Sequence, residues 1–346
     1  MNETSQPPAN HKCMCCWQRQ EMTQVSMPDT LAFNQFVDQP FQTTVRGQVT
    51  FDGIGLHSGR FVELSICPAP ANTGIKFRRV DIDAKLQTVE AHAKYAEQAR
   101  LCTRIVNGDG IGLETIEHMM AAFAGVGLDN AVVEINAPEA PILDGSSQPV
   151  LDAINAVGLE LLPARRKHII VTKPVMVSLD DGAWARLDPC EHLEIIIEIA
   201  FDDAAIGNQT LTYRHSDGSF AAELASARTF CQLRDVERMK NAGLALGGSL
   251  DNAVVVNDGK ILNDGGLRME REFVRHKALD CLGDLLLLGM PVKAKMTAHR
   301  PGHALSTKLV QTLLNDPSAF KIVEAGTTQS RSDSFVLPEL AAAATA

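Results

Sequence analysis

The sequence predicts an α+β fold of two similar domains, each a β-sheet packed by helices, with the active site at their interface. Three observations indicate this. The chain has 346 residues, 45% of them hydrophobic, which is enough to bury two cores. Short β-rich runs punctuated by glycine, proline and asparagine precede a helical pattern in each half. The succession of helix, glycine turn, strand, loop and helix then occurs twice along the chain.

The first domain is expected to span residues 43–164. Its strands are predicted in short runs at 45–51, 62–67, 74–78 and 131–135. Its helices are predicted at 114–124, ended by Gly125 and Gly127, and at 149–157. A loop at 138–147 leads into the second helix.

The second domain is expected to span residues 165–320. Its strands are predicted at 169–177, 193–201 and 292–297. Its helices are the one that carries His276, which ends near Gly289, and one at 305–314. An insert at about 231–265, with glycine pairs and many apolar residues, is interpreted either as ordinary core or as an apolar channel.

The two ends of the chain are expected to be tails. Residues 1–42 are rich in proline, glutamine and asparagine, and they lack the apolar segment of a signal peptide. His11, Cys13 and Cys16 have the spacing of half a zinc site, but no second pair follows at the usual distance. Residues 321–346 end in an uncharged, alanine-rich run, which we expect to be flexible and to serve as a protease recognition element.

Charge and hydropathy narrow the possible partners. The net charge of −10 argues against nucleic acid as a partner. No run reaches the roughly 18 to 20 apolar residues that span a bilayer, so no transmembrane segment is expected. Apart from the early cluster the cysteines are scattered, which fits reduced thiols in a cytoplasmic protein. We expect a monomer that acts on a small molecule.

Two distant segments together hold the residue types that a catalytic zinc site requires. His276 and Asp280 are spaced i, i+4, which puts both side chains on one helix face, and Asp284 extends the row. Glu117 and His118 lie on a helix of the other half. Two imidazoles and a carboxylate give three ligands and leave a fourth position open, as in hydrolytic zinc sites. Fe²⁺ would suit the same ligands.

The remaining polar residues suggest roles in hydrolysis of an amide. Glu117 need not bind the metal and can act as general base on a water molecule. His303 is the candidate acid that protonates the leaving nitrogen. Asp284 could orient His303 or hold it protonated. Lys277 could bind anionic oxygens, and Thr229 offers a hydroxyl to an oxyanion.

Structural interpretations compete with these roles. A Glu-His pair is unspecific, and histidines in HxxxD helices are often simply solvated or paired with a carboxylate. Four other histidines are first interpreted as structural: His57, His92, His168 and His215. His57 is the least secure of them, because its glycine-rich loop could turn the side chain into a site.

A series of segments between Thr43 and Leu314 carries a resemblance to a known family. They are GIGLHSG (53–59), PAPANTGIKFRRVD (68–81), LCTRI (101–105), TIEHMMAAFAG (115–125), NAPEAPILDGSS (136–147), ARTF (227–230), GGSLDNAVVV (247–256), EFVRHKALDCLGDL (272–285) and PGHAL around His303. In this order and at these spacings, the chain resembles the zinc-dependent UDP-3-O-acyl-N-acetylglucosamine deacetylases (LpxC), which catalyse the committed step of lipid A biosynthesis.

The resemblance implies two α+β domains with a small insert in each, and it implies specific roles. Zinc would be held by His118, His276 and Asp280. The substrate would be an acylated UDP-sugar whose N-acetyl group is hydrolysed. The other implied roles are Glu117 as base, His303 with Asp284 as acid, Thr229 at the oxyanion, Phe230 and Lys277 at the sugar nucleotide, Cys102 near the metal, and Val236, Leu250 and Val255 along the acyl passage.

Some questions stay open at this stage. Leu250 stands where some relatives have a larger aromatic residue, so the preferred acyl length is undetermined. Cys102 has a second interpretation as a small buried hydrophobe. Two other functions compete with the deacetylase: a zinc amidohydrolase acting on another sugar or peptide, and a metal-stabilised interaction protein without catalysis.

Overall fold

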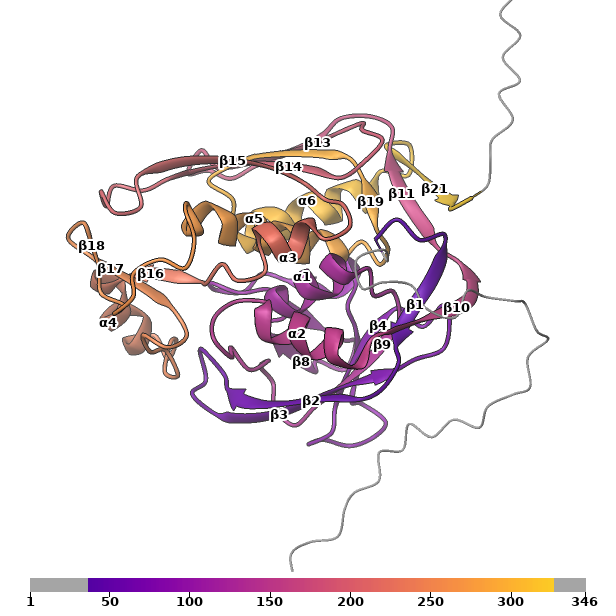
Figure 1. The fold of residues 1–346 in the computed structure, drawn as a ribbon, viewed down its shortest axis with the longest axis horizontal. Helices are drawn as coiled ribbons and strands as arrows, with labels where there is room; N and C mark the ends of the chain where they lie inside the picture. Colours follow the sequence, from indigo (N-terminus) through magenta and orange to yellow (C-terminus); the bar gives the residue numbers. More distant parts are fainter. Residues whose placement is uncertain (1–36, 327–346) are drawn as a thin grey trace, which may run out of the picture.

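The computed structural model describes residues 37–326 (Figure 1). Expectations that fall on residues 1–36 and 327–346, including the early Cys/His cluster and the alanine-rich end, lie outside the described residues. None of the helices in the described part of the chain combines the length and the apolar character needed to cross a membrane.

The first repeat is built on a five-stranded sheet of order β2-β3-β9-β4-β5. Its strands are β2 (Val49–Ile54), β3 (Phe61–Pro68), β9 (Ala131–Ile135), β4 (Ile75–Arg79) and β5 (Thr88–Glu90). The pair β4–β9 is parallel and the other pairs are antiparallel. Its helices are α1 (Glu117–Val126) and α2 (Gln148–Val157).

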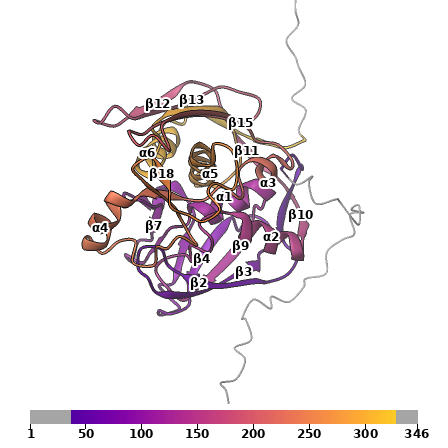
Figure 2. The same cartoon turned by 60° about the vertical axis from the view of Figure 1, so that its left-hand side comes forward.

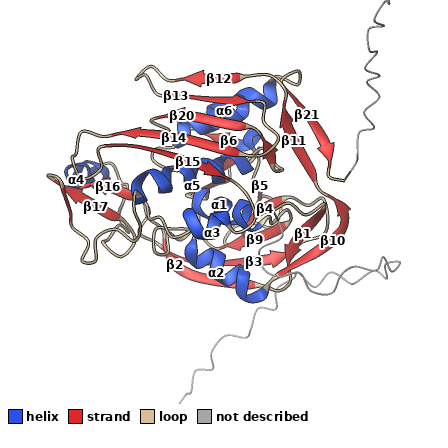
Figure 3. Ribbon diagram, turned by 45° about the horizontal axis from the view of Figure 1, so that its top comes forward, coloured by secondary structure: helices blue, strands red, loops and turns tan. Residues whose placement is uncertain are grey.

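The second repeat has a five-stranded sheet of order β12-β13-β20-β14-β15, seen along the top of Figure 3. Its strands are β12 (Val175–Ser178), β13 (Trp184–Asp188), β20 (Lys295–His299), β14 (Glu194–Ala200) and β15 (Asn208–Arg214). Again one pair, β14–β20, is parallel and the rest are antiparallel. Its helices are α3 (Ser219–Glu223), α5 (Glu272–Leu286) and α6 (His303–Asn315).

The two sheets therefore have the same strand order and the same pairing directions, which confirms the α+β fold with two similar halves. In β14, alternate residues Ile195, Ile197 and Ile199 are buried, as expected for a sheet with one face on helices. We propose that the two repeats are the two domains, and that they divide between residues 164 and 165 as expected from the sequence.

The helices of the two repeats lie between the two sheets (Figures 1 and 2). At the centre, α1 packs directly against α5, and Gly283 makes their close approach possible. A Cβ at Gly283 would overlap the backbone carbonyl oxygen of Glu117. This contact joins the two halves next to the residues that the sequence predicts to be functional.

Smaller elements complete the fold. An insert in each half forms a three-stranded sheet. The first contains β6 (Ala96–Glu97), β7 (Arg104–Val106) and β8 (Gly112–Glu114), after the 3-10 helix η1 (Ala93–Tyr95). The second contains β16 (Phe230–Gln232), β17 (Val254–Asn257) and β18 (Lys260–Ile261), with α4 (Leu233–Asn241), at the left of Figure 1. The remaining sheets pair β1 (Phe41–Val45) with β10 (Leu159–Arg165), and β11 (Lys167–Val171) with β19 (Val292–Lys293) and β21 (Phe320–Glu324).

Several expected boundaries were wrong. The run 169–177 forms two strands, β11 and β12, in different sheets, and 292–297 divides in the same way into β19 and β20. The β-rich pattern of such a run does not show with which neighbour each part pairs. The N-terminal tail was expected to reach residue 42, but β1 begins at Phe41. The C-terminal tail was expected from residue 321, but β21 continues to Glu324 because it pairs with β11.

Candidate active site

A cavity of about 930 Å³ lies where the two repeats meet the second insert. Its wall includes Glu117 and His118 from α1 and His276, Lys277 and Asp280 from α5. The two predicted segments, 115–118 and 275–280, therefore converge on one cavity although more than 150 residues separate them. The contact between α1 and α5 at Gly283 fixes their relative position.

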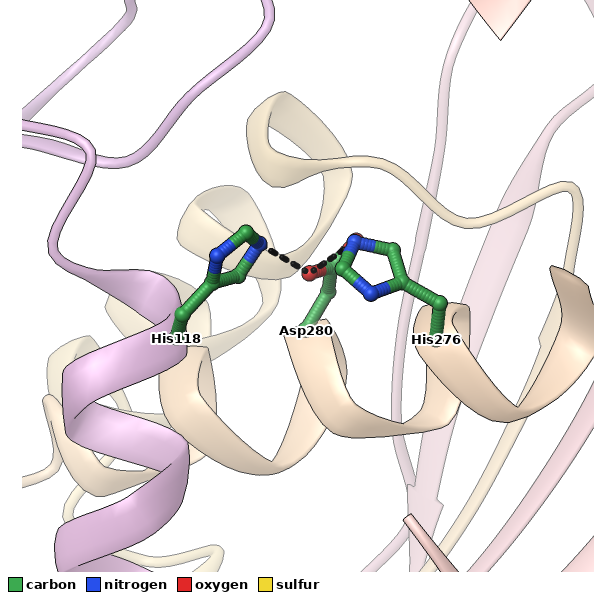
Figure 4. A group of neighbouring side chains, drawn as sticks. All are labelled: His118, His276 and Asp280. Atoms are coloured by element: carbon green, nitrogen blue, oxygen red, sulfur yellow. Dashed lines mark ion pairs between the residues drawn. The ribbon is translucent and has the colours of Figure 1, made fainter. Parts of the chain in front are cut away.

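His118, His276 and Asp280 form one compact cluster, in which each offers a ligand atom within 4.8 Å of the others (Figure 4). Asp280 Oδ1 is 3.3 Å from His276 Nε2 and 3.7 Å from His118 Nε2. Ligands about 2.0 to 2.1 Å from a tetrahedral Zn²⁺ lie roughly 3.3 Å apart, so the spacing suits such an ion.

The environment of these three side chains also suits a cation. Asp280 Oδ1 is buried and has no hydrogen-bond partner, which is unfavourable for a carboxylate unless a cation is bound. His276 Nδ1 donates to the carbonyl oxygen of Ala227 at 3.0 Å, so its Nε2 lone pair is free to coordinate. Burial lowers the pKa of His276, and it lowers the pKa of His118 to about 3, so both rings are neutral. The donor set therefore fits a divalent metal ion.

Lys277 supports the carboxylate ligand. Its ammonium group donates to Asp280 Oδ2 at 2.8 Å, which leaves Oδ1 to face the histidines. Burial alone would lower the pKa of Lys277, but the charge of Asp280 raises it, so the amine stays charged. Burial would likewise raise the pKa of Asp280, but His276 and Lys277 hold it below its ordinary value.

Glu117 and His303 lie close to each other on the wall of the cavity. Glu117 Oε1 is 3.5 Å from His303 Nε2, and the Glu117 side chain is buried, whereas that of His303 is 11% exposed. Burial raises the pKa of Glu117 to about 7, although His303 opposes the rise. Burial alone would lower the pKa of His303, but Glu117 and Asp284 raise it to about 9. A carboxyl with a raised pKa beside a charged imidazole is a suitable acid–base pair.

Comparison with known proteins identifies the family of the chain. The sequence model of the family described as "LpxC: UDP-3-O-acyl N-acetylglycosamine deacetylase" matches residues 42–315. The chain belongs to the LpxC family. Curated relatives named UDP-3-O-acyl-N-acetylglucosamine deacetylase include one from Shewanella halifaxensis, 41% identical over 300 residues that cover 86% of this chain and 97% of the relative. The relative from Citrifermentans bemidjiense is 45% identical over 284 residues, covering 82% of this chain and 92% of its own.

Most residues singled out from the LpxC motifs line the cavity. Thr229 and Phe230 lie on its wall beside Lys277, whose Nζ is 5.7 Å from the centre of the Phe230 ring. In the second insert, further apolar side chains line the same cavity: Leu233, Val236, Met239, Leu244, Leu250 and Val255.

Three expected positions differ from the sequence interpretation. His303 was placed in a loop, but it is the first residue of α6, because the helical backbone begins directly after Gly302. Cys102 is 2% exposed and is not among the cavity-lining residues, and burial raises the pKa of its thiol to about 12. His57, first interpreted as structural, lines the cavity, and its buried Nε2 has no hydrogen-bond partner.

The sequence interpretation missed residues that support the LpxC-type site. Glu272 is fully buried and accepts from Arg228 at 2.8 Å, next to Thr229. The spacing could have identified it, since Glu272 lies four residues before His276 on the same helix face. Thr103 contacts Glu117 through its backbone and Asp284 through its hydroxyl. No spacing rule would have found it.

Proposed function

We propose that this chain hydrolyses the N-acetyl group of UDP-3-O-acyl-N-acetylglucosamine to acetate and the free amine, the committed step of lipid A biosynthesis. The observation that carries the proposal is the convergence of a metal-binding triad with a facing Glu117–His303 pair on one cavity. Membership of the LpxC family and the names of the relatives support the substrate.

The proposed ligands of the metal are His118, His276 and Asp280. Zn²⁺ bound there would lower the pKa of a water to about 7 and polarise the acetyl carbonyl. Fe²⁺ suits the same donor set. Lys277 holds Asp280 Oδ2, so this carboxylate presents Oδ1 toward the two imidazoles.

Glu117 is the proposed general base, which takes a proton from the water that attacks the carbonyl carbon. A raised pKa suits this role, because the carboxylate then becomes a stronger base. His303, charged and turned with Nε2 toward Glu117, is the proposed acid, which donates a proton to the departing amine nitrogen. Asp284 accepts from His303 Nδ1 at 3.1 Å and keeps the ring in place.

Other cavity residues are assigned to the substrate. The hydroxyl of Thr229 would donate to the oxyanion. Phe230 and Lys277 would contact the sugar nucleotide, and the passage that contains Val236, Leu250 and Val255 would hold the acyl chain. Cys102 lies behind this wall, so a direct substrate contact is not part of the proposal.

We further propose a cytoplasmic, monomeric enzyme without nucleic-acid partners, in keeping with the net charge of −10. Protease recognition of the last residues is a separate proposal about a segment outside the described residues. Equal cellular half-lives of the full chain and a chain that ends at Pro338 would contradict it.

The test is acetate release from the acylated UDP-sugar by wild type and Glu117→Ala, together with metal analysis of the purified protein. We expect release by wild type and a loss of at least 100-fold in the variant. Full activity of the variant would refute the assigned base. Equal rates on substrates without an acyl chain would favour a broader amide hydrolase, and bound metal without any hydrolysis would favour a non-catalytic role.

A further inference from the structure

Thr103 lies at the point where the acid and base residues of the proposed reaction come closest. It immediately precedes β7 in the first repeat and is 2% exposed. It is not among the residues that line the cavity. Thr103 therefore contacts Glu117 and His303 on the side away from the cavity, outside the space that a substrate would fill.

The hydrogen bonds of Thr103 reach both halves of the molecule. Its backbone N–H donates to Glu117 Oε2 at 3.0 Å, so the other carboxylate oxygen is left toward His303. Its Oγ1 lies 2.5 Å from Asp284 Oδ1, on α5, and donates its single proton there. Since that proton is used, Oγ1 can only accept from His303 Nδ1, which lies 3.0 Å away.

This arrangement specifies the protonation of the His303 ring. Nδ1 faces two acceptors, Thr103 Oγ1 at 3.0 Å and Asp284 Oδ2 at 3.1 Å, so Nδ1 carries a proton in every state of the ring. The proton that can be exchanged is then the one on Nε2, which points toward Glu117. Asp284 alone would give Nδ1 of the His303 ring one hydrogen bond. The hydroxyl of Thr103 gives it a second one and also restrains the Asp284 carboxylate by donating to it.

We propose that Thr103 is a positioning residue that holds Glu117, Asp284 and His303 in register across the domain interface and keeps His303 protonated at Nδ1. The inference rests on the proposed deacetylase function and extends it to a residue without direct contact to the substrate. Because Thr103 lies outside the cavity wall, its loss should affect the chemical step and leave substrate binding unchanged.

Two substitutions separate this role from simple packing. Thr103→Val keeps the shape and the backbone N–H but removes the hydroxyl, and Thr103→Ser restores the hydroxyl. We expect kcat of the valine variant to fall roughly 10- to 100-fold with KM unchanged, and the serine variant to recover most of the rate. Thr44→Val is the matched control, because Thr44 is equally buried and its hydroxyl donates to Asn130 far from the cavity.

The coupling of Thr103 to His303 is tested in a double variant. In a His303→Gln background, Thr103→Val should lower kcat by less than about twofold. The hydroxyl of Thr103 is proposed to act through His303, so its loss has little further effect when His303 is already absent. Equal kcat in wild type and Thr103→Val, or a serine variant as impaired as the valine variant, would overturn the inference. A full, multiplicative loss in the double variant would overturn it as well.

A measurement without turnover distinguishes this inference from the proposed function. In ¹⁵N-histidine NMR of the metal-loaded protein, His303 should show a protonated Nδ1, assigned by its absence in His303→Gln. Its proton resonance should persist in Thr103→Ser and move in Thr103→Val, and an unmoved resonance would contradict the role. Absence of acetate release by wild type would instead refute the proposed function, while the NMR result would still decide the role of Thr103.

Discussion

The backbone carbonyl oxygen of Glu117 lies against the α-carbon of Gly283, with no room between them for a Cβ. The two residues belong to α1 and α5, the central helices of the two repeats. The proposed ligand His118 directly follows Glu117 in α1, and the proposed ligand Asp280 lies about one helical turn before Gly283 in α5. The close approach of two backbones therefore determines the distance between ligands that come from different halves of the chain.

Gly283→Ala should destabilise the protein and should also move the proposed metal ligands on α1 and α5 apart. The added methyl group must push α5 away from α1, and overpacking of this kind typically costs about 1–3 kcal/mol in the free energy of unfolding. We expect reduced metal content in addition, since the ligands on α1 and α5 move apart. Gly108→Ala is the control, because nothing lies within 4 Å of a Cβ built there. Wild-type metal content in Gly283→Ala would show that the contact does not position the ligands.

The sequence predicted the residues of the site better than their surroundings. His276, Asp280 and Asp284 were found because an i, i+4 spacing is local and belongs to one helix. The repeated order of elements correctly predicted two similar halves, and so a meeting place for Glu117 and His276. Motif resemblance supplied the rest of the proposed roles.

What the sequence could not predict depends on long-range packing. The role of Gly283 can be understood only once α1 is known to pack against it. Thr103 is a threonine in a short irregular segment, and its three hydrogen-bond partners come from three other elements. The division of 292–297 into two strands likewise depends on which neighbour each strand pairs with, and the strand pattern itself carries no such information.

Removal of the metal should destabilise the folded protein. Without a cation, Asp280 Oδ1 is a buried carboxylate oxygen with no hydrogen-bond partner, so binding should favour the folded state. We expect a chelator to lower the Tm of wild type by several degrees, and zinc to restore it. Asp280→Asn should bind less than a tenth of the metal and should show little change of Tm with chelator.

The matched control for this experiment is Asp109→Asn, a carboxylate in an exposed turn. It should retain both the metal and the response to chelator. An equal effect of chelator on Asp280→Asn and wild type would show that the stabilising ion binds somewhere else.

The buried Arg228–Glu272 ion pair should make a large contribution to stability. Glu272 is fully buried and accepts hydrogen bonds from Arg228 N, Arg228 Nε and Arg268 N. Arg228→Met would leave this carboxylate without its cation, and loss of one partner of a buried pair costs about 3–5 kcal/mol. Denaturation by urea measures the change. Arg238→Ala is the control, because the Arg238 side chain is 80% exposed and its pair with Asp235 should contribute less than about 1 kcal/mol.

The same substitution should also affect activity if the pair positions Thr229, which follows Arg228 directly in the chain. We expect kcat of Arg228→Met to fall at a temperature where the variant is still folded. A variant of reduced stability but unchanged kcat would limit the pair to a structural role.

Two histidines outside the candidate site, His168 and His215, should contribute to a loss of stability in acid. Burial lowers the pKa of each from 6.5 to about 4. Arg166 and, for His168, Lys293 contribute to these lowered pKa values, while Asp38 opposes them. The unfolded chain therefore takes up protons below about pH 6.5, whereas the folded chain does so only near pH 4. Their contribution to stability is complete above pH 6.5 and is lost as the pH falls toward 4.

Urea denaturation at several pH values between 7.5 and 5 tests this directly, because most carboxylates remain ionised over that range. We expect the free energy of unfolding of wild type to decrease steadily from pH 6.5 to 5. His168→Gln and His215→Gln should each make the decrease less steep, since each removes one group that binds a proton only after unfolding. If both variants showed the slope of wild type, other groups would have to account for the acid sensitivity, and these two histidines would titrate alike in the folded and unfolded states.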